Sequence, residues 1–224
     1  MPGGMSLHEK TIAQLLPSSY TSMAIGKWHL GIGAKPGGTE FMPTQRGFDS
    51  YFGVPHGLGA CPCFGCFPQA DGGRRACAIG CQPAWAPCPL YNGTEIVQQP
   101  ANLLTLSDQY GSAAADFVKS SAAAGFPFFL FYASHHVHSP QYAGKVCTNS
   151  SRRGRVGDSL AQLDAEVGRV LDVVRSAGAS ANTLTIFSSD NGPSLRNRGR
   201  GGNAGLLRCG KGTTYEHGSP LLVP

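Results

Sequence analysis

The sequence predicts an α/β domain with a largely parallel central sheet flanked by helices. Residues 127–133 and 183–188 are short apolar runs, as in strands that are buried inside such a sheet. An amphipathic helix is predicted between them, over residues 158–177. A strand, helix, strand order indicates a right-handed crossover between parallel strands. Because ligands gather where such strands end, the polar residues after each strand are the first candidates for a site.

The N-terminal part of the chain contributes one predicted helix and one predicted strand. Ser6 and Glu9 stand at the positions of a capping box, so a short surface helix is predicted over residues 7–16. A strand is predicted over residues 20–25, where apolar residues run up to a glycine. Residues 31–99 are rich in turn-forming residues, and we expect them to be irregular.

Two helices follow in the second half of the chain. The first is predicted over residues 107–124 and ends at Gly125. The second, residues 158–177, is predicted to bury one apolar stripe, and its acids Asp164 and Glu166 are expected to face solvent or cap neighbours rather than act in catalysis. The predicted stripe consists of Leu160, Leu163, Val167, Val170, Leu171 and Val174.

The composition is that of a globular protein. The 224 residues are 41% apolar, which is enough for a hydrophobic core. Part of the net charge of +5 comes from arginines at 152–155 and 196–200, where no aromatic residues are interleaved, so nucleic acid is not an expected partner. No apolar run is long enough to span a bilayer, and no apolar signal segment follows Met1. We therefore expect no transmembrane segment, and we expect an upstream segment to be missing.

Cysteines and sequons indicate an oxidising compartment. Six of the eight cysteines lie between Cys61 and Cys88, among Pro and Gly residues, which is typical of a loop held by disulfides. A zinc cluster is the alternative, although the spacing lacks a paired C-x2-C. Asn92 and Asn149 begin N-glycosylation sequons. Together these features favour the secretory pathway.

Asp190 and Asn191 follow the predicted strand 183–188 and form a candidate metal site. Carboxylate and amide oxygens are ligands that Ca²⁺ or Mg²⁺ prefers, so the pair could supply part of a metal shell. The alternative is a polar turn, because Asp-Asn-Gly-Pro is also a strong turn sequence.

Lys27 and His29 follow the predicted strand 20–25. Two residues apart in extended backbone, they would lie on one face, with Trp28 packing on the other. That face would carry a cation beside a titratable base. A surface lysine and a hydrogen-bonded histidine are an equally good interpretation of these two residues alone.

Three histidines and a further lysine complete the candidates. His135, His136 and His138 follow the predicted strand 127–133, and they could serve a zinc site or an anion-binding loop, with one of them structural. Lys211 lies between two glycines, where little would shield its side chain from a ligand, although an exposed turn lysine looks the same.

Four separated motifs occur in one order, namely residues 26–31 (GKWHLG), 133–140 (ASHHVHSP), 189–193 (SDNGP) and 207–216 (LRCGKGTTYE). This ordered set resembles the type I sulfatases from about Ser6 onward. The resemblance implies an alkaline-phosphatase-like α/β fold, a Ca²⁺ or Mg²⁺ ion and hydrolysis of sulfate esters to an alcohol or phenol plus sulfate. It also implies a secreted or lysosomal location.

The same resemblance implies a role for each candidate. Asp190 and Asn191 correspond to metal ligands, and Lys27 and Lys211 to the cations that hold the sulfate oxygens. His138 corresponds to the histidine that contacts the sulfate and the leaving group, and His29 to the base that recycles the nucleophile. These roles agree with the chemistry, since a transferring sulfuryl group needs positive charge on its oxygens and a proton donor for the departing oxygen.

The chain departs from the family at the nucleophile. In the family this is a formylglycine made from the Cys of Cys-x-Pro-Ser-Arg, and the 224 residues contain neither that motif nor the early Asp pair that completes the metal shell. We therefore expect a piece that begins after the nucleophile, stops before a C-terminal domain, and is inactive by itself. In addition, His56 and Gly57 occupy the loop where the family often has a substrate-contacting Ser.

The resemblance also implies a partial sulfatase catalytic domain over residues 1–224, with a cysteine-rich insertion at about 57–98. Within that insertion it implies a nested pair of disulfides and leaves two further cysteines to each other, while Cys209 would be free. The implied bonds are Cys61 with Cys81, Cys66 with Cys77, and Cys63 with Cys88.

Three other functions compete with an arylsulfatase-like hydrolase. One is a non-catalytic sulfate-binding relative, and another is a phosphatase or phosphodiesterase of the same superfamily. The third is a zinc module that would use His135, His136 and His138 with the cysteines. The expected partner is a sulfated small molecule, glycolipid or glycan, and a homo-oligomer is compatible with the sequence.

Overall fold

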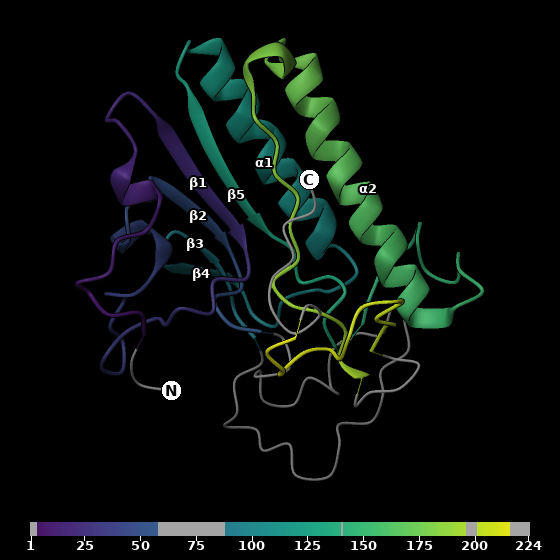
Figure 1. The fold of residues 1–224 in the computed structure, drawn as a ribbon. Coiled ribbons are helices and arrows are strands. Elements are labelled where there is room, and N and C mark those ends of the chain that lie inside the picture. Colours follow the sequence, from purple (N-terminus) through teal and green to yellow (C-terminus); the bar gives the residue numbers. More distant parts are fainter. Residues whose placement is uncertain (1–3, 58–87, 140, 196–200, 216–224) are drawn as a thin grey trace.

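The computed structural model describes residues 4–57, 88–139, 141–195 and 201–215 (Figure 1). Its sheet has the strand order β4-β3-β2-β1-β5. β1 pairs in parallel with β2 and with β5, whereas the β2–β3 and β3–β4 pairs are antiparallel. The α/β prediction is therefore confirmed, with a mixed sheet. The strands are β1 (Thr21–Gly26), β2 (Ser50–Gly53), β3 (Leu90–Asn92), β4 (Glu95–Gln98) and β5 (Phe128–Ala133).

β1 is an interior strand of the sheet, and both of its faces are covered. Successive side chains of a strand point to opposite faces of the sheet. Met23 and Ile25 belong to a hydrophobic core that includes residues of α1, and Ala24 belongs to a second core with Trp28 and Phe48. Packing on both sides holds β1, and with it the residues that follow Gly26, in one position.

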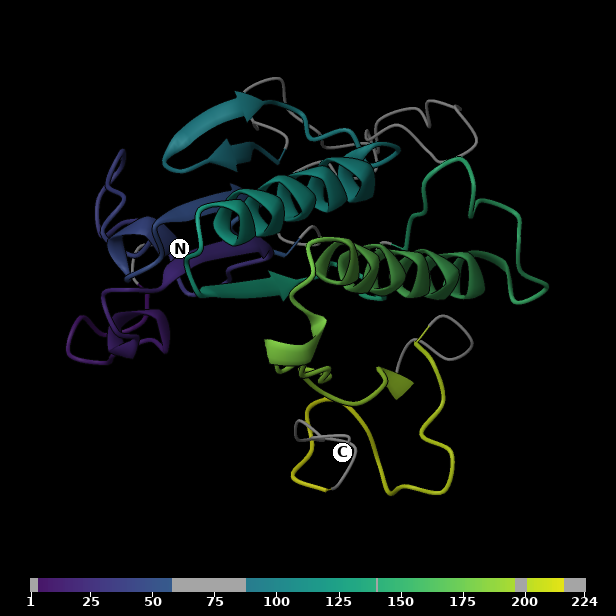
Figure 2. The same cartoon turned by 90° about the horizontal axis from the view of Figure 1, so that it is seen from above.

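Two long helices lie side by side in Figures 1 and 2, α1 (Leu106–Ala123) and α2 (Gly154–Ser176). α1 packs against β1, β2 and β5, and α2 packs against α1. The predicted helices 107–124 and 158–177 are thus confirmed, although α2 begins four residues earlier than predicted. Three short 3-10 helices complete the described elements, η1 (Ala13–Leu15), η2 (Pro43–Gln45) and η5 (Ser180–Asn182). Within the described residues, no helix is long and apolar enough to cross a membrane.

The buried stripe of α2 differs from the predicted one. Leu160 and Leu171 are exposed, whereas Ser159, Gln162 and Glu166 are buried. The reason is that these polar side chains have partners in the loop after β5 and in the following segment, so α2 buries a hydrogen-bonded polar face. Of the two expected settings for these acids, Glu166 is buried against neighbouring side chains, while Asp164 faces solvent.

The predicted surface helix over residues 7–16 is reduced to the single turn η1. The reciprocal hydrogen bonds of a capping box are formed by Thr11 and Gln14 rather than by Ser6 and Glu9. The Arg46 guanidinium donates to the backbone carbonyls of Ser6 and Glu9, which engages those carbonyls outside a helix. The helical turn therefore begins at Ala13 rather than at residue 7.

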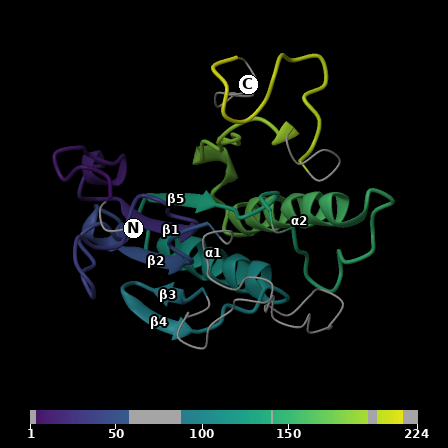
Figure 3. The same ribbon diagram turned by 90° about the horizontal axis from the view of Figure 1, so that it is seen from below.

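The predicted strand over residues 183–188 is not formed as a strand. Its apolar side chains are exposed, with Leu184 at 85%, Ile186 at 70% and Phe187 at 55% of their surface. Figures 2 and 3 show this stretch leading away from the sheet after α2. A strand is stable only beside a hydrogen-bonded neighbour. None of the described strands pairs with this stretch, so the apolar pattern alone does not make it a strand.

Two further expectations need correction. Residues 31–99 are not wholly irregular, since they contribute β2 and the β3–β4 hairpin. The prediction failed because these strands have only three or four residues, too few to show a period. β5 is only partly buried, with Phe131 exposed, because it lies at the edge of the described sheet.

Candidate functional site

The ends of β1 and β5 bring two of the predicted motifs together. The two strands run parallel in a register that pairs Gly26 with Ala133, their last residues. The backbone N–H of Lys27 then donates to the carbonyl of Ala133 over 2.9 Å. The carboxyl ends of parallel strands meet at one edge of a sheet, so the residues after both strands share that edge.

Gly26 is required for this close approach. Its φ of 92° lies in the left-handed region, and an added Cβ would stand 2.1 Å from the Ala133 carbonyl oxygen. The hydroxyl of Tyr51, a fully buried residue of β2, donates to the Gly26 carbonyl over 3.0 Å. The turn that presents Lys27 is therefore fixed from two neighbouring strands.

His29 is placed by a strained turn rather than by extended backbone. Its φ is 63°, a left-handed conformation that costs a residue with a side chain on the order of 1–2 kcal/mol. Its N–H donates to the carbonyl of Pro55 over 2.7 Å, which brings the loop of His56 and Gly57 to the site. The premise that Lys27 and His29 share one face of an extended strand was therefore wrong.

A small pocket lies at this edge of the sheet. Its lining consists of Lys27, Gly57, His135, His138 and Ser139. The lysine side chain is 19% exposed, whereas His138 is exposed at the pocket mouth. A lysine and a histidine from two different strand ends thus reach one pocket, an arrangement that suits an anion with an attached leaving group.

His138 has a defined ring orientation. Its Nδ1 lies 2.6 Å from the Ser139 carbonyl, so Nδ1–H donates to that oxygen and Nε2 is left for a ligand. The backbone N–H of His138 donates to the His135 carbonyl over 3.0 Å, which closes a turn between the two histidines.

His135 is buried and uncharged. Burial, followed by the charges of His136 and Lys27, lowers the pKa of His135 from 6.5 to about 3. Its ring stacks on Tyr110, and its Nε2 is buried without a hydrogen-bond partner among the described residues. Burial likewise lowers the pKa of His56, with the charge of His29 as the next cause. Two of the imidazoles around the pocket are therefore biased towards their neutral forms.

His136 is the structural histidine of the three. Its Nε2 lies 3.2 Å from a Glu166 oxygen and 3.0 Å from the Ser107 hydroxyl, and its Nδ1 lies 2.9 Å from the Ser159 hydroxyl. These partners come from both long helices. Among the described residues, no group of three His, Cys, Asp or Glu side chains could hold a metal ion.

The C-terminal motifs reach the site from the stretch after α2. Asp190 lies 3.4 Å from the Lys27 ammonium, in a pair where the carboxylate is 67% exposed. The backbone N–H of Lys211 donates to the carbonyl of Pro193 over 3.0 Å, which joins the last motif to the SDNGP turn. The Lys211 side chain is exposed and is not part of the pocket lining, and neither is Asn191.

The residues present do not fit a complete Ca²⁺ or Mg²⁺ site. Such a shell needs about six to eight oxygen ligands for calcium and about six for magnesium. Asp190 and Asn191 offer a carboxylate and an amide, and the carboxylate faces Lys27. We therefore derive no step through a metal ion.

Several predicted residues lie outside the described ranges, namely Cys61, Cys63, Cys66, Cys77 and Cys81. Cys88 is disulfide-bonded, whereas Cys147 and Cys209 are free. Both sequon asparagines are exposed, Asn92 at the end of β3 and Asn149 in the loop before α2.

Sequence reasoning missed two contributors. Ser139 lines the pocket, and Glu166 holds the loop that follows β5. A signal for Glu166 exists, since it stands three residues after Leu163 and four before Val170, within the helical period of the predicted buried stripe. A charged residue at a buried position needs a partner, and that partner is not readable from the sequence.

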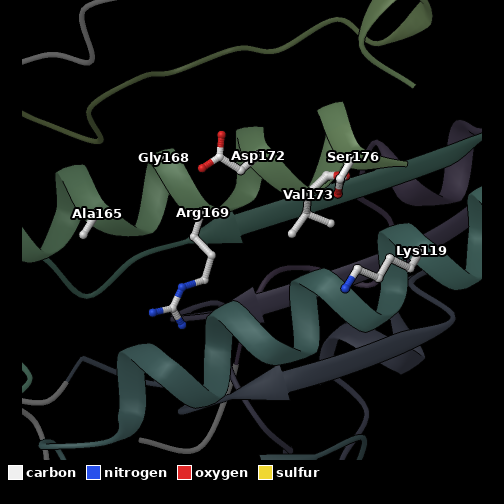
Figure 4. A pocket seen from close by; sticks show the side chains of 7 residues that line it. All are labelled: Lys119, Ala165, Gly168, Arg169, Asp172, Val173 and Ser176. Carbon is white, nitrogen blue, oxygen red and sulfur yellow. The ribbon is translucent and has the colours of Figure 1, made fainter. Parts of the chain in front are cut away.

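A larger hollow lies between α1 and α2, away from the strand ends (Figure 4). Its lining includes Lys119, Gly168, Arg169 and Asp172. Arg169 pairs with Asp108 over 2.8 Å, and Asp172 pairs with Arg175. The hollow is open and its arginine is already paired, so the strand-end pocket is the better candidate despite its smaller size.

The chain is similar to known sulfatases over nearly its whole length. The family model described as Sulfatase matches residues 3–223. Over 219 residues the chain is 42% identical to arylsulfatase A of Homo sapiens, and over 227 residues it is 35% identical to N-acetylgalactosamine-6-sulfatase of Canis lupus familiaris. Each alignment covers 96% of this chain, but 42% and 39% of the respective relative.

Solved structures show the same fold. Ps i-CgsB in complex with k-i-k-neocarrahexaose has a TM-score of 0.71 and 26% sequence identity, over 98% of this chain and 48% of that chain. The PsFucS1 sulfatase from Pseudoalteromonas sp. has a TM-score of 0.70 over 88% of this chain. The predicted alkaline-phosphatase-like sulfatase fold is thereby confirmed. The chain spans less than half the length of these relatives, and it belongs to the sulfatase family.

Proposed function

We propose that this chain supplies the sulfate-binding part of an arylsulfatase-type sulfuric ester hydrolase. The observation that supports this most is the pocket that the ends of β1 and β5 form, with Lys27 from one strand end and His138 from the other. In this proposal Lys27 and Lys211 hold the sulfate oxygens, His138 serves the leaving group, and His29 serves as the base.

The charges and hydrogen bonds of the pocket support these roles. The ammonium of Lys27 is 19% exposed and would neutralise part of the charge on a bound sulfate. Because Nδ1–H of His138 donates to the Ser139 carbonyl, Nε2 faces the ligand, and in the doubly protonated ring it would donate a proton to the ester oxygen as the sulfur–oxygen bond breaks.

The proposed substrate is a sulfated small molecule, glycolipid or glycan. Support comes from the relatives' names, which include N-acetylgalactosamine-6-sulfatase, and from the complex of Ps i-CgsB with k-i-k-neocarrahexaose. We also propose a secreted or lysosomal location with glycans on Asn92 and Asn149. The disulfide at Cys88 and the exposure of both asparagines support an oxidising compartment.

A non-catalytic sulfate-binding protein is the second candidate. It would use the same pocket of Lys27 and His138 to hold the anion. For both candidates we expect this chain to bind sulfate and not to hydrolyse a chromogenic aryl sulfate. Measurable turnover would show that another nucleophile operates and would contradict the non-catalytic function.

The test is a titration of the chain with inorganic sulfate and, separately, with inorganic phosphate. Lys27→Met should weaken sulfate binding by about tenfold or more, because a charge-assisted hydrogen bond is lost. Lys119→Met is the matched control, since it removes an exposed lysine of α1 far from the strand ends and should leave the affinity unchanged. Equal losses in both variants would indicate non-specific charge attraction and oppose the proposal. Tighter binding of phosphate would favour a phosphatase or phosphodiesterase.

A further inference from the structure

A buried carboxylate holds the loop that carries His138. Glu166 of α2 has a side chain that is 4% exposed. One of its oxygens lies 3.2 Å from Nε2 of His136, and the other accepts a hydrogen bond from the Ser134 hydroxyl over 2.9 Å. The two oxygens of one carboxylate thus hold the two residues on either side of His135.

His136 extends this contact to both helices. Because the Glu166 carboxylate accepts, Nε2 of His136 carries a ring proton, and the Ser159 hydroxyl lies 2.9 Å from Nδ1. The Ser107 hydroxyl of α1 lies 3.0 Å from Nε2, and the ring of Tyr142 lies 4.4 Å from that of His136. The start of the loop is therefore tied to α1 and α2 as well as to β5.

The same contacts reach the pocket through the backbone. The N–H of His136 donates to the Ser134 hydroxyl over 3.1 Å, and the N–H of His138 donates to the His135 carbonyl. Fixing Ser134 and His136 therefore fixes the turn that sets His138 relative to Lys27. Of the loop residues, His135, His138 and Ser139 line the pocket.

We propose that Glu166 is a positioning residue for the sulfate pocket, acting through Ser134 and His136 to hold His138 opposite Lys27. The inference rests on the proposed function where it names sulfate as the ligand. Glu166 does not line the pocket itself. Its effect on a ligand is transmitted by the loop.

A contribution to stability does not by itself explain the buried contact between Glu166 and His136. Replacing a buried ion pair by apolar residues of similar volume is often neutral or stabilising, because burial of the charges costs about as much as their attraction returns. Burial raises the pKa of Tyr132, and the neighbouring Glu166 is the next cause of that shift. A carboxyl group kept among buried tyrosines fits a need for one defined geometry.

The test combines hydrogen exchange with sulfate titration on the full 224-residue chain. Glu166→Gln keeps the shape of the side chain and removes its charge, and Ser134→Ala removes one partner while leaving the pair with His136. Asp164→Asn is the matched control, because Asp164 is an exposed acid on the same helix. The measured quantities are amide exchange of residues 135–138, the affinity for inorganic sulfate, and Tm.

At a temperature well below its Tm, we expect Glu166→Gln to speed amide exchange at residues 135–138. We also expect it to weaken sulfate binding by about tenfold, since a misplacement of about 1 Å is costly at a binding site. Ser134→Ala should act in the same direction with a smaller effect, and Asp164→Asn should change neither quantity. A purely structural role predicts a lower Tm with unchanged loop exchange and unchanged affinity in the folded chain, and this result would overturn the inference. If Glu166→Gln fails to fold, the loop exchange and sulfate affinity of Ser134→Ala test the inference instead.

The two proposals fail differently. If the unsubstituted chain does not bind sulfate, the proposed function fails, while the exchange of residues 135–138 still shows whether Glu166 orders the loop. If the chain binds sulfate and both variants bind it equally well, the positioning inference fails and the proposed function stands.

Discussion

The site residues that follow β1 and β5 are held differently from those that follow α2. Lys27 and His29 donate backbone hydrogen bonds to Ala133 and Pro55, at the carboxyl ends of the packed strands. Asp190 reaches the same place through an exposed side-chain contact of 3.4 Å with Lys27. The first group is positioned by the fold, and the second depends on a polar contact that water and salt weaken. We call residues 183–195 and 201–215 the C-terminal stretch.

The candidate anion-binding residues and the candidate metal ligands therefore belong to different regions of the chain. The pocket with Lys27 and His138 is part of the folded sheet, whereas the metal-ligand candidates Asp190 and Asn191 and the second lysine, Lys211, belong to the C-terminal stretch. Anion binding is therefore the property that we expect the sheet to supply by itself.

The largest expected effect breaks the junction of β1 and β5. Gly26→Ala would put a Cβ 2.1 Å from the Ala133 carbonyl oxygen at a φ of 92°, so we expect a loss of about 4 kcal/mol or more in the free energy of unfolding. The matched control is Gly178→Ala after α2, where φ is 72° and no atom lies within 4 Å, with an expected loss of about 1 kcal/mol. Urea unfolding measures both. Equal losses would mean that the close approach to β5 does not exist.

A pair of leucine truncations compares the two regions directly. Leu106→Ala empties a fully buried position in α1, with an expected loss of about 3 kcal/mol in stability. Leu184→Ala changes a side chain that is 85% exposed, so its effect should stay within about 0.5 kcal/mol. Both losses are calculated from the shift in the denaturant midpoint, with the m-value of the unsubstituted chain used for both variants. A large loss at Leu184 would show that the C-terminal stretch is packed in solution.

Acidification should destabilise the sheet region through His135. Its pKa is lowered from 6.5 to about 3 in the fold, so the unfolded chain binds a proton that the folded chain does not. The free energy of unfolding should therefore fall as the pH drops below about 6.5, by about 1.4 kcal/mol per pH unit and by about 2 kcal/mol at pH 5. Above pH 6.5 this contribution to the pH dependence vanishes.

His135→Gln isolates that contribution. Between pH 4 and 6, the free energy of unfolding of the variant should change less steeply with pH, by the amount that corresponds to about one bound proton. His8→Gln, at an exposed position, should keep the slope of the unsubstituted chain. If His135→Gln leaves the slope unchanged, the imidazole of His135 is not buried.

The smallest effect concerns the contact between the two regions. Asp190→Asn should alter stability by less than about 0.5 kcal/mol, because its carboxylate is 67% exposed and surface ion pairs contribute little. The free Lys27 ammonium should then bind sulfate at least as tightly as before. A stability loss of several kcal/mol would show that Asp190 is more deeply buried than its exposure indicates.

Strands and helices with a clear period were predictable, and so were the site residues next to them. The ends of β1 and β5 were correctly identified as the origin of Lys27 and His138, because an apolar run that stops at a polar cluster is visible in the sequence. The stretch 183–188 shows the same kind of run and forms no strand. A strand needs a hydrogen-bonded neighbour, and no pattern within the run reveals whether one is present.

The sequence also did not reveal which polar residues are buried. The sequence indicates a helix over α2, but it does not tell which of its polar residues is buried against a partner, so Asp164 and Glu166 received the same prediction. His136 likewise looks the same as His135 and His138 until Ser107, Ser159 and Glu166 surround it. Partners that are 20 or more residues apart in the chain come from the fold alone.

The most direct test of the account is a sulfate titration monitored by the ring ¹⁵N signals of the histidines and the side-chain ¹⁵N signal of Lys27. If the ends of β1 and β5 form one anion pocket, the signals of His138 and Lys27 should shift together with a single dissociation constant, while the exposed His8 should not respond. Shifts with two different constants, or equal shifts at His8, would contradict a common pocket.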